Sequence, residues 1–169
     1  MKFVQALTSV LVKIETVLLV VFLSVMALLA FSQVVLRNIF GTGLLWADPM
    51  TRQMVLWSGF MGAALATSAD RHISVDAFTK YLSPRTNQTI KIVTSLAAAV
   101  VTIFLAHAAW EFVVNEKEAG GEIFLGIPSW IGLSIIPTGY ALITIHFLAH
   151  GIESAVTRFG PKTPPPGGK

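Results

Sequence analysis

The residues of this sequence with the richest chemistry are four histidines and the charged residues near one of them. His72 lies in the run Asp70-Arg71-His72-Ile73-Ser74-Val75-Asp76, whereas His107, His146 and His150 lie in apolar stretches. Two imidazoles at one depth on facing helices could ligate a haem iron. His72 could instead order a turn through hydrogen bonds to its charged neighbours, or contact a partner protein.

A second group of chemically informative residues begins at Trp46. Asp48 precedes Pro49, which predicts Asp48 as the N-cap of a helix and Pro49 as its first helical residue. Arg52 follows Asp48 by four residues, so the two side chains share one face where the helix enters the bilayer. Small residues then recur at the four-residue spacing that lets helix backbones approach closely in lipid: Gly59 with Ala63, and Gly62 with Ala66.

The composition places these residues in a membrane protein. Of the 169 residues 54% are hydrophobic and 12% are charged, and the mean hydropathy is +0.71; soluble domains are roughly 25% charged. The chain has no cysteine, which removes disulfides, cysteine-ligated zinc and thiol nucleophiles. Its net charge of +3 comes from residues that flank apolar segments, so nucleic acid is not implied. No hydrolase triad, phosphate-binding glycine loop or metal-ligand cluster is present in the sequence, so we expect no enzyme activity.

The expected elements are four membrane-spanning helices in one domain, residues 1–160. Met1–Glu15 reads as a short amphipathic lead-in at the membrane surface, and 21 uncharged residues follow, enough to cross a hydrocarbon core of about 30 Å. Pro137 and Gly139 predict a kink in the last helix. The predicted spans are residues 16–36, 49–69, 91–111 and 128–152.

The connecting segments predict an orientation. Residues 73–82 alternate apolar and polar side chains like an interfacial helix, residues 115–122 form a solvated acidic loop, and residues 161–169 form a disordered tail. Nine of the twelve lysines and arginines fall on one side if the N-terminus is inside. The positive-inside rule therefore predicts both termini, and the tail, in the cytoplasm.

The distribution of charge also limits the activity. A self-sufficient ion-coupled transporter usually shows intramembrane carboxylates or paired broken helices in two inverted halves. The centres of the four predicted spans lack both, which indicates an accessory subunit that holds a partner. His107 is expected near the outer end of its helix, and His146 and His150 near the inner end of theirs. This disfavours bis-histidine ligation, although a haem-b or quinone-binding membrane anchor remains the alternative.

The order of these motifs resembles the small membrane subunit of tripartite ATP-independent periplasmic (TRAP) transporters, the DctQ family. Asp48 departs from the pattern, because the family commonly has glutamate there. The resemblance extends from about Lys13 to Gly160. The residues that carry it are Arg37-Asn38-Ile39-Phe40, Trp46, Asp48, Arg52, Trp57, Gly59, Gly62, Ala63 and the stretch Arg71-His72-Ile73-Ser74-Val75-Asp76.

The resemblance implies a subunit of the bacterial inner membrane that acts with two partners. A periplasmic binding protein would deliver an organic acid, such as a C4-dicarboxylate or a sugar acid, to a large DctM-type subunit that moves it with sodium. Substrate and sodium would bind the large subunit, and this chain would hold no cofactor. It would serve as a scaffold in the lipid bilayer. Its motif residues would either form the interface with the partner or have a structural role within this chain: Trp46, Asp48, Arg52, Trp57, Gly59, Gly62, Ala63, Arg71, His72 and Asp76. Glu116, Glu118 and Glu122 of the acidic loop are expected to touch the binding protein.

Overall fold

The computed structural model describes residues 2–69 and 84–159, which form helices joined by short connections. No β-strand occurs in these two ranges, which confirms the all-α class. Arg71, His72, Asp76, the predicted interfacial helix and the predicted tail lie outside the described residues. The elements are α1 (Lys2–Ile39), α2 (Ala47–Ser68), α4 (Pro84–Ala119), α5 (Ser129–Leu133) and α6 (Ile135–Phe159).

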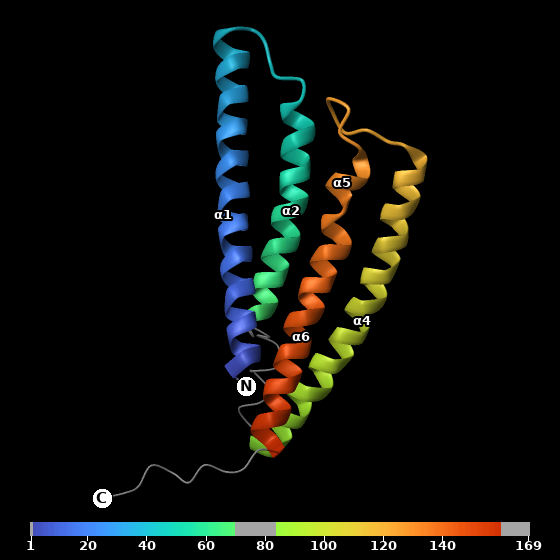
Figure 1. Ribbon diagram of the computed structural model, residues 1–169. Coiled ribbons are helices and arrows are strands. Elements are labelled where there is room, and N and C mark those ends of the chain that lie inside the picture. The colour runs from blue at the N-terminus through green and yellow to red at the C-terminus, as the bar shows by residue number, and fades with distance from the viewer. Residues whose placement is uncertain (1, 70–83, 160–169) are drawn as a thin grey trace, which may run out of the picture.

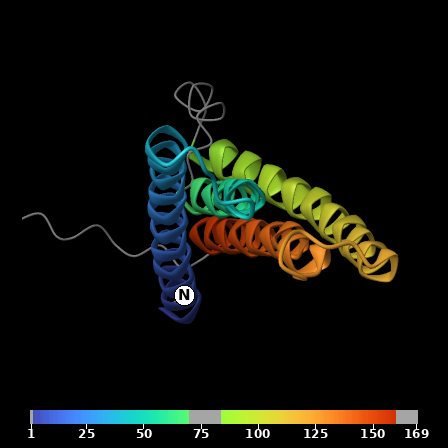
Figure 2. The ribbon, with the colours of Figure 1, turned by 90° about the horizontal axis from the view of Figure 1, so that it is seen from above.

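The long helices follow one another across the molecule in the order α1, α2, α6, α4 (Figure 1). Helix α2 packs against α1 and α6, α6 packs against α4, and α1 meets α6 at few positions. The beginning of α1 and the end of α6 lie at the same end of the molecule. Seen from above, α1 leans in a different direction from α4 and α6 (Figure 2).

Three helical segments of the described chain are long and apolar enough to cross a membrane: Ala6–Ile39, Thr89–Ala119 and Ser129–Val156. Helix α2 has 22 residues, a sufficient length, but it is not one of these three segments. Its sequence contains Asp48 and Arg52 together with many small and polar residues. It nevertheless runs beside α1 and α6 (Figure 1). The predicted fourth crossing therefore depends on packing and stays a prediction.

The first helix differs from its predicted form. Helix α1 is continuous over 38 residues, so no separate lead-in precedes the span. Neither glycine nor proline occurs between Lys2 and Ile39, so nothing interrupts the hydrogen-bond ladder. The Glu15 side chain is only 2% exposed, so it is packed inside the helical bundle, and its predicted position at the membrane surface stays a prediction.

The start of α2 also differs by a small shift. The helix begins at Ala47 with Trp46 in the N-cap position, and no side chain caps it. Asp48 is therefore a first-turn acid, not the N-cap. Gln33 of α1 holds the preceding loop: its Nε2 donates to the Leu44 carbonyl at 2.9 Å, and its Oε1 accepts from the Leu44 N–H at 2.9 Å. A side chain of α1 thus sets where α2 begins.

Small and hydroxylated residues line the contact between α4 and α6. Ser95 and Ala99 of α4 are buried, as their spacing predicts for a close helix contact. The Thr144 hydroxyl of α6 donates to the Thr102 hydroxyl of α4 at 2.8 Å, and Thr102 in turn donates to the Ala98 carbonyl. This buried chain of hydrogen bonds joins two helices without any charge.

The predicted interruption of the last span lies one turn before Pro137. The span divides at Ser134 into α5 and α6, with Pro137 in the first turn of α6. Because proline has no N–H, the Leu133 carbonyl loses its helical partner, and the helix breaks there. Gly139 follows, and a Cβ at this position would lie 2.4 Å from Cδ1 of Phe60. The glycine therefore admits the Phe60 ring of α2.

The predicted acidic loop is partly helical. Helix α4 continues to Ala119, so residues 115–119 form its last turn, and the connection proper covers residues 120–128. Backbone hydrogen bonds close this connection, from Ser129 N–H to the Gly121 carbonyl and from Ile123 N–H to the Ile127 carbonyl. Helix α4 is uninterrupted because neither glycine nor proline occurs between Pro84 and Gly120.

Candidate functional site

One face of α2 is left uncovered by the described helices, and we call it the open face of α2. This face consists of one arginine at the start of the helix, followed by a valine and three small residues. All five are exposed: Arg52, Val55, Gly59, Ala63 and Ala66. The opposite side carries the buried residues Ala47, Met54, Met61 and Ala64. Helix α2 thus has one face in the core and one available to a neighbour.

Of the two glycines that motivated the prediction of close packing, Gly59 lies on the open face of α2 and Gly62 is half-buried beside it. A Cβ built on Gly59 or on Gly62 would meet nothing within 4 Å. The described helices of this chain therefore do not use the small residues at 59 and 62. The glycines packed closely against α2 are instead Gly132 of α5 and Gly139 of α6, where a Cβ would overlap Gln53 and Phe60 of α2.

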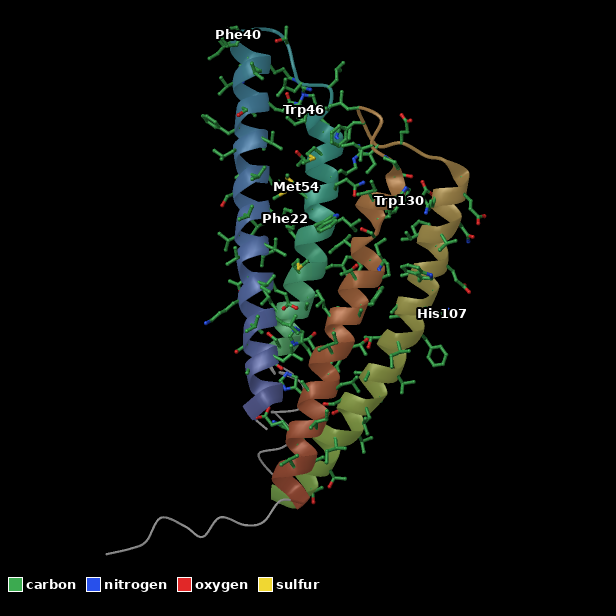
Figure 3. The ribbon with its side chains drawn as sticks, in the orientation of Figure 1. Phe22, Phe40, Trp46, Met54, His107 and Trp130 are labelled. Carbon is green, nitrogen blue, oxygen red and sulfur yellow. The ribbon has the colours of Figure 1, made fainter. Side chains whose placement is uncertain are left out.

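Trp57 has a role inside the chain. Its Nε1 donates to the Gly132 carbonyl at 2.9 Å, and its ring meets that of Phe22 edge to face at a centroid separation of 5.5 Å. Figure 3 shows Phe22 and Met54 in the region between α1 and α2. Trp57 therefore joins α1, α2 and α5, which fits the structural alternative for this motif residue.

The charged residues at the start of α2 do not pair with each other. Asp48 and Arg52 are both exposed, and the Asp48 carboxylate accepts a 3.4 Å hydrogen bond from Gln33. Among the described residues no ion pair engages Arg52. Arg52 therefore places a cation at the end of the open face of α2 that is next to the α1–α2 loop.

The three glutamates predicted to touch a binding protein are in different environments. Glu116 is half-buried, and its Oε1 accepts a 2.6 Å hydrogen bond from the Ser129 hydroxyl. Glu118 and Glu122 are exposed at the same end of the molecule as the α1–α2 loop. Lys117 lies over the ring of Trp130, 5.3 Å from its centroid, near the start of α5 (Figure 3). Only two of the three acids are therefore free to meet a partner.

The three described histidines have three separate environments. His107 is largely exposed on α4 and lies 3.7 Å from Glu111. His150 Nε2 lies 3.0 Å from the Thr67 carbonyl oxygen. His146 is fully buried beside Glu15. These partners leave no facing pair of imidazoles among the described residues, so the geometry does not support the haem alternative.

The buried pair of Glu15 and His146 is the polar contact that the sequence reasoning missed. His146 Nε2 lies 3.0 Å from Oε1 and 3.2 Å from Oε2 of Glu15, which is 131 residues away in sequence. A carboxylate next to the 21-residue uncharged run of a helix is a signal for such a contact. Its partner is not visible from sequence spacing. Within the described ranges no group of three or more histidines, aspartates or glutamates could hold a metal ion.

The comparison with known proteins agrees with this architecture. Residues 26–157 match the model of the family described as tripartite ATP-independent periplasmic transporters, DctQ component. This match covers most of the chain, including α2 and the α4–α6 unit. The chain belongs to the DctQ family, the small permease subunits of TRAP transporters.

Two relatives carry a more particular description. The chain is 26% identical to the C4-dicarboxylate TRAP transporter small permease protein DctQ of Vibrio cholerae, over 80% of this chain and 68% of that protein. It is 28% identical to the protein of the same description from Pseudomonas aeruginosa, over 85% of this chain and 83% of that protein. With its three apolar helices, the chain is a multi-pass inner-membrane component of a transporter.

Proposed function

We propose that this chain is the scaffold of its TRAP transporter and that it holds the large permease subunit through the open face of α2. The observation that carries the proposal is the exposure of Gly59 and Ala63 on a helix whose other side is packed. In lipid, apolar surface alone does not drive helix association, and small residues favour it by allowing close backbone contact. Arg52 at one end of this face adds a group that can pair with an acid of the partner.

The remaining architecture of the proposal follows from packing and charge. Helix α2 is the fourth membrane crossing, shielded by α1 and α6, so that four helices span the membrane. The ends of α1 and α6 that lie together face the cytoplasm, in accord with the positive-inside rule. The α1–α2 loop and the exposed Glu118 and Glu122 then face the periplasm, where a substrate-binding protein can reach them.

The transport activity belongs to the assembled complex. Sodium and substrate bind the large permease in this proposal, because the centres of the four predicted spans of this chain contain no aspartate, glutamate, lysine or arginine. The substrate class is an organic acid. C4-dicarboxylates are the first compounds to test, because the two relatives are described as C4-dicarboxylate small permeases.

The direct test is co-purification of the large permease with tagged full-length chain from co-expressing membranes. Gly59→Leu and Gly62→Leu add bulk where this chain has open space, so we expect each to fold and to recover much less permease. The matched control is Ala97→Leu, which adds bulk at an exposed position of α4. Undiminished recovery with both glycine variants would show that the permease binds elsewhere.

Uptake of a radiolabelled C4-dicarboxylate by vesicles completes the test. Vesicles that contain the permease and this chain, supplied with the binding protein, should accumulate substrate when sodium is present outside. Vesicles without this chain should not. Equal uptake in its absence would exclude a scaffold role that transport requires.

A further inference from the structure

The contact between α1 and α6 depends on very few residues. Helix α1 packs along α2, but it meets α6 at few positions. Toward the beginning of α1 and the end of α6, the two helices border a largely apolar groove of about 500 Å³. The groove lining includes Val12 and Lys13 of α1 and His150 of α6. Glu15 follows Lys13 by two residues in α1, and His146 precedes His150 by about one turn in α6.

The Glu15–His146 pair is shielded from water. The exposed fractions of the Glu15 and His146 side chains are 2% and 0%, so neither side chain is accessible to solvent. Lys13 is exposed two residues before Glu15, and no ion pair joins them in the described structure. In the described part of the chain, the other ring nitrogen of His146, Nδ1, has no hydrogen-bond partner. The hydrogen bonding of the His146 side chain therefore depends on Glu15.

The same burial makes each polar group depend on the other. A buried carboxyl group or imidazole without a hydrogen-bond partner is costly in an apolar environment. Glu15 Oε1 and His146 Nε2 lie 3.0 Å apart, so each supplies the hydrogen-bond partner of the other. Removal of one partner would leave the other buried without compensation.

We propose that the Glu15–His146 hydrogen bond is a polar clasp that fixes α1 against α6 and sets where the two helices cross. Apolar contacts between helices in lipid tolerate sliding and rotation, whereas a buried hydrogen bond between two side chains has one geometry. The clasp is internal to this chain. It is therefore independent of permease binding, and an experiment on the purified chain can fail without bearing on the scaffold function.

The first experiment measures thermal unfolding of the full chain in detergent. His146→Leu leaves a buried carboxyl group and Glu15→Leu leaves a buried imidazole, so we expect the unfolding temperature to fall by about 5–10 °C in each. The double variant Glu15→Leu/His146→Leu removes both groups and should recover most of this loss. His107→Leu and Glu111→Leu are matched controls, because they disrupt an exposed histidine–glutamate pair.

The second experiment measures position. The chain has no cysteine, so spin labels can be placed directly at Leu7 of α1 and Leu148 of α6, both exposed. We expect a narrow distance distribution in the otherwise unchanged chain and a broader or shifted one in the leucine double variant. A label pair at Val93 of α4 and Leu148 should not change, because α4 and α6 have their own contacts.

Two results would overturn the proposal. The first is that the single variants accumulate in membranes and have the same unfolding temperature as the two surface controls. The second is an unchanged α1–α6 distance distribution in the double variant, because the pair would then fill space without setting position. If the single variants do not accumulate in membranes while the surface controls and the double variant do, that pattern supports the proposal, and the distance measurement on the double variant decides it.

Discussion

The indole nitrogen of Trp57 donates a 2.9 Å hydrogen bond to the backbone carbonyl of Gly132, 75 residues further along the chain. This carbonyl lies in α5, just before the break at Ser134, where the helical ladder cannot satisfy every backbone acceptor. Trp57 therefore stabilises a helix interruption in the neighbouring span. The ring also contacts Phe22 of α1, so one side chain connects three helices.

Substitution of Trp57 separates these two contributions. We expect Trp57→Phe to lower the free energy of unfolding by about 1 kcal/mol, because it keeps an aromatic ring and loses one hydrogen bond. Trp57→Ala should cost about 3–5 kcal/mol, because it also leaves a cavity. Unfolding of the detergent-solubilised chain, followed by tryptophan-independent circular dichroism, measures both. Equal losses for the two variants would contradict a separate role for the ring.

Gly139 should not tolerate even one added carbon. Its Cβ would overlap the Phe60 ring, so we expect Gly139→Ala to destabilise the α2–α6 contact by about 1–3 kcal/mol. Gly62→Ala is the matched control, because open space surrounds that position and alanine favours helix by up to about 1 kcal/mol. Thermal unfolding compares the two. A loss at Gly62 as large as that at Gly139 would contradict the assignment of the tight contact.

Gln33 should control the order of the α1–α2 loop. Gln33→Leu removes both hydrogen bonds to Leu44, so residues 40–46 should become more sensitive to protease. Ser32→Leu changes a neighbouring exposed residue and should leave the cleavage rate unchanged. Limited proteolysis of inverted and right-side-out vesicles also reports the side on which the loop lies. Cleavage confined to the cytoplasmic side would refute the proposed orientation.

Reversal of the two exposed acids tests contact with the binding protein. We expect Glu118→Lys/Glu122→Lys to reduce C4-dicarboxylate uptake while recovery of the large permease stays unchanged, because both side chains are exposed and neither belongs to the open face of α2. Glu116 must be left intact, since its bond to Ser129 holds the end of α4 to α5. The effect should weaken at high salt, as expected for exposed charges. Unaltered uptake would exclude the contact.

Arg52 allows a test of permease binding that adds no side-chain bulk to the open face of α2. Arg52→Gln keeps a polar side chain but removes the cation at one end of the open face of α2, and it should lower the recovery of the permease. Arg37→Gln is the control, because Arg37 is also an exposed cation, at the end of α1. Equal recovery with both variants would indicate that the open face binds through its small residues alone.

The sequence was sufficient for the class of fold and for the family, because both depend on apolar runs and on the order of short motifs. The exposed small-residue face of α2 follows from its periodicity, with Gly59 and Ala63 on one side and Met54 and Met61 on the other. The continuous form of α1 could also have been predicted, since no glycine or proline separates Lys13 from the apolar run.

The contacts that the sequence did not predict join distant residues. Glu15 follows Lys13 at the edge of an apolar segment, which is also the pattern of a membrane-surface residue. Only the placement of α1 beside α6 brings it to His146 and explains its burial. The contact of Trp57 inside the bundle could not be predicted from the sequence for the same reason, because its hydrogen-bond acceptor is a backbone carbonyl next to a helix break in a distant segment. Local patterns carry no information about such partners.

The helical segment Ala6–Ile39 of α1 has 34 residues and is about 51 Å long at about 1.5 Å per residue, which is longer than a hydrocarbon thickness of about 30 Å. Its uncharged part, residues 16–36, is about 31 Å long, so the charged ends of the helix can reach the headgroups. Figure 2 shows that α1 leans in a different direction from α4 and α6, so these helices cannot all stand parallel to the membrane normal. We therefore expect the inclination of α1 to change with the acyl-chain length of the surrounding lipid.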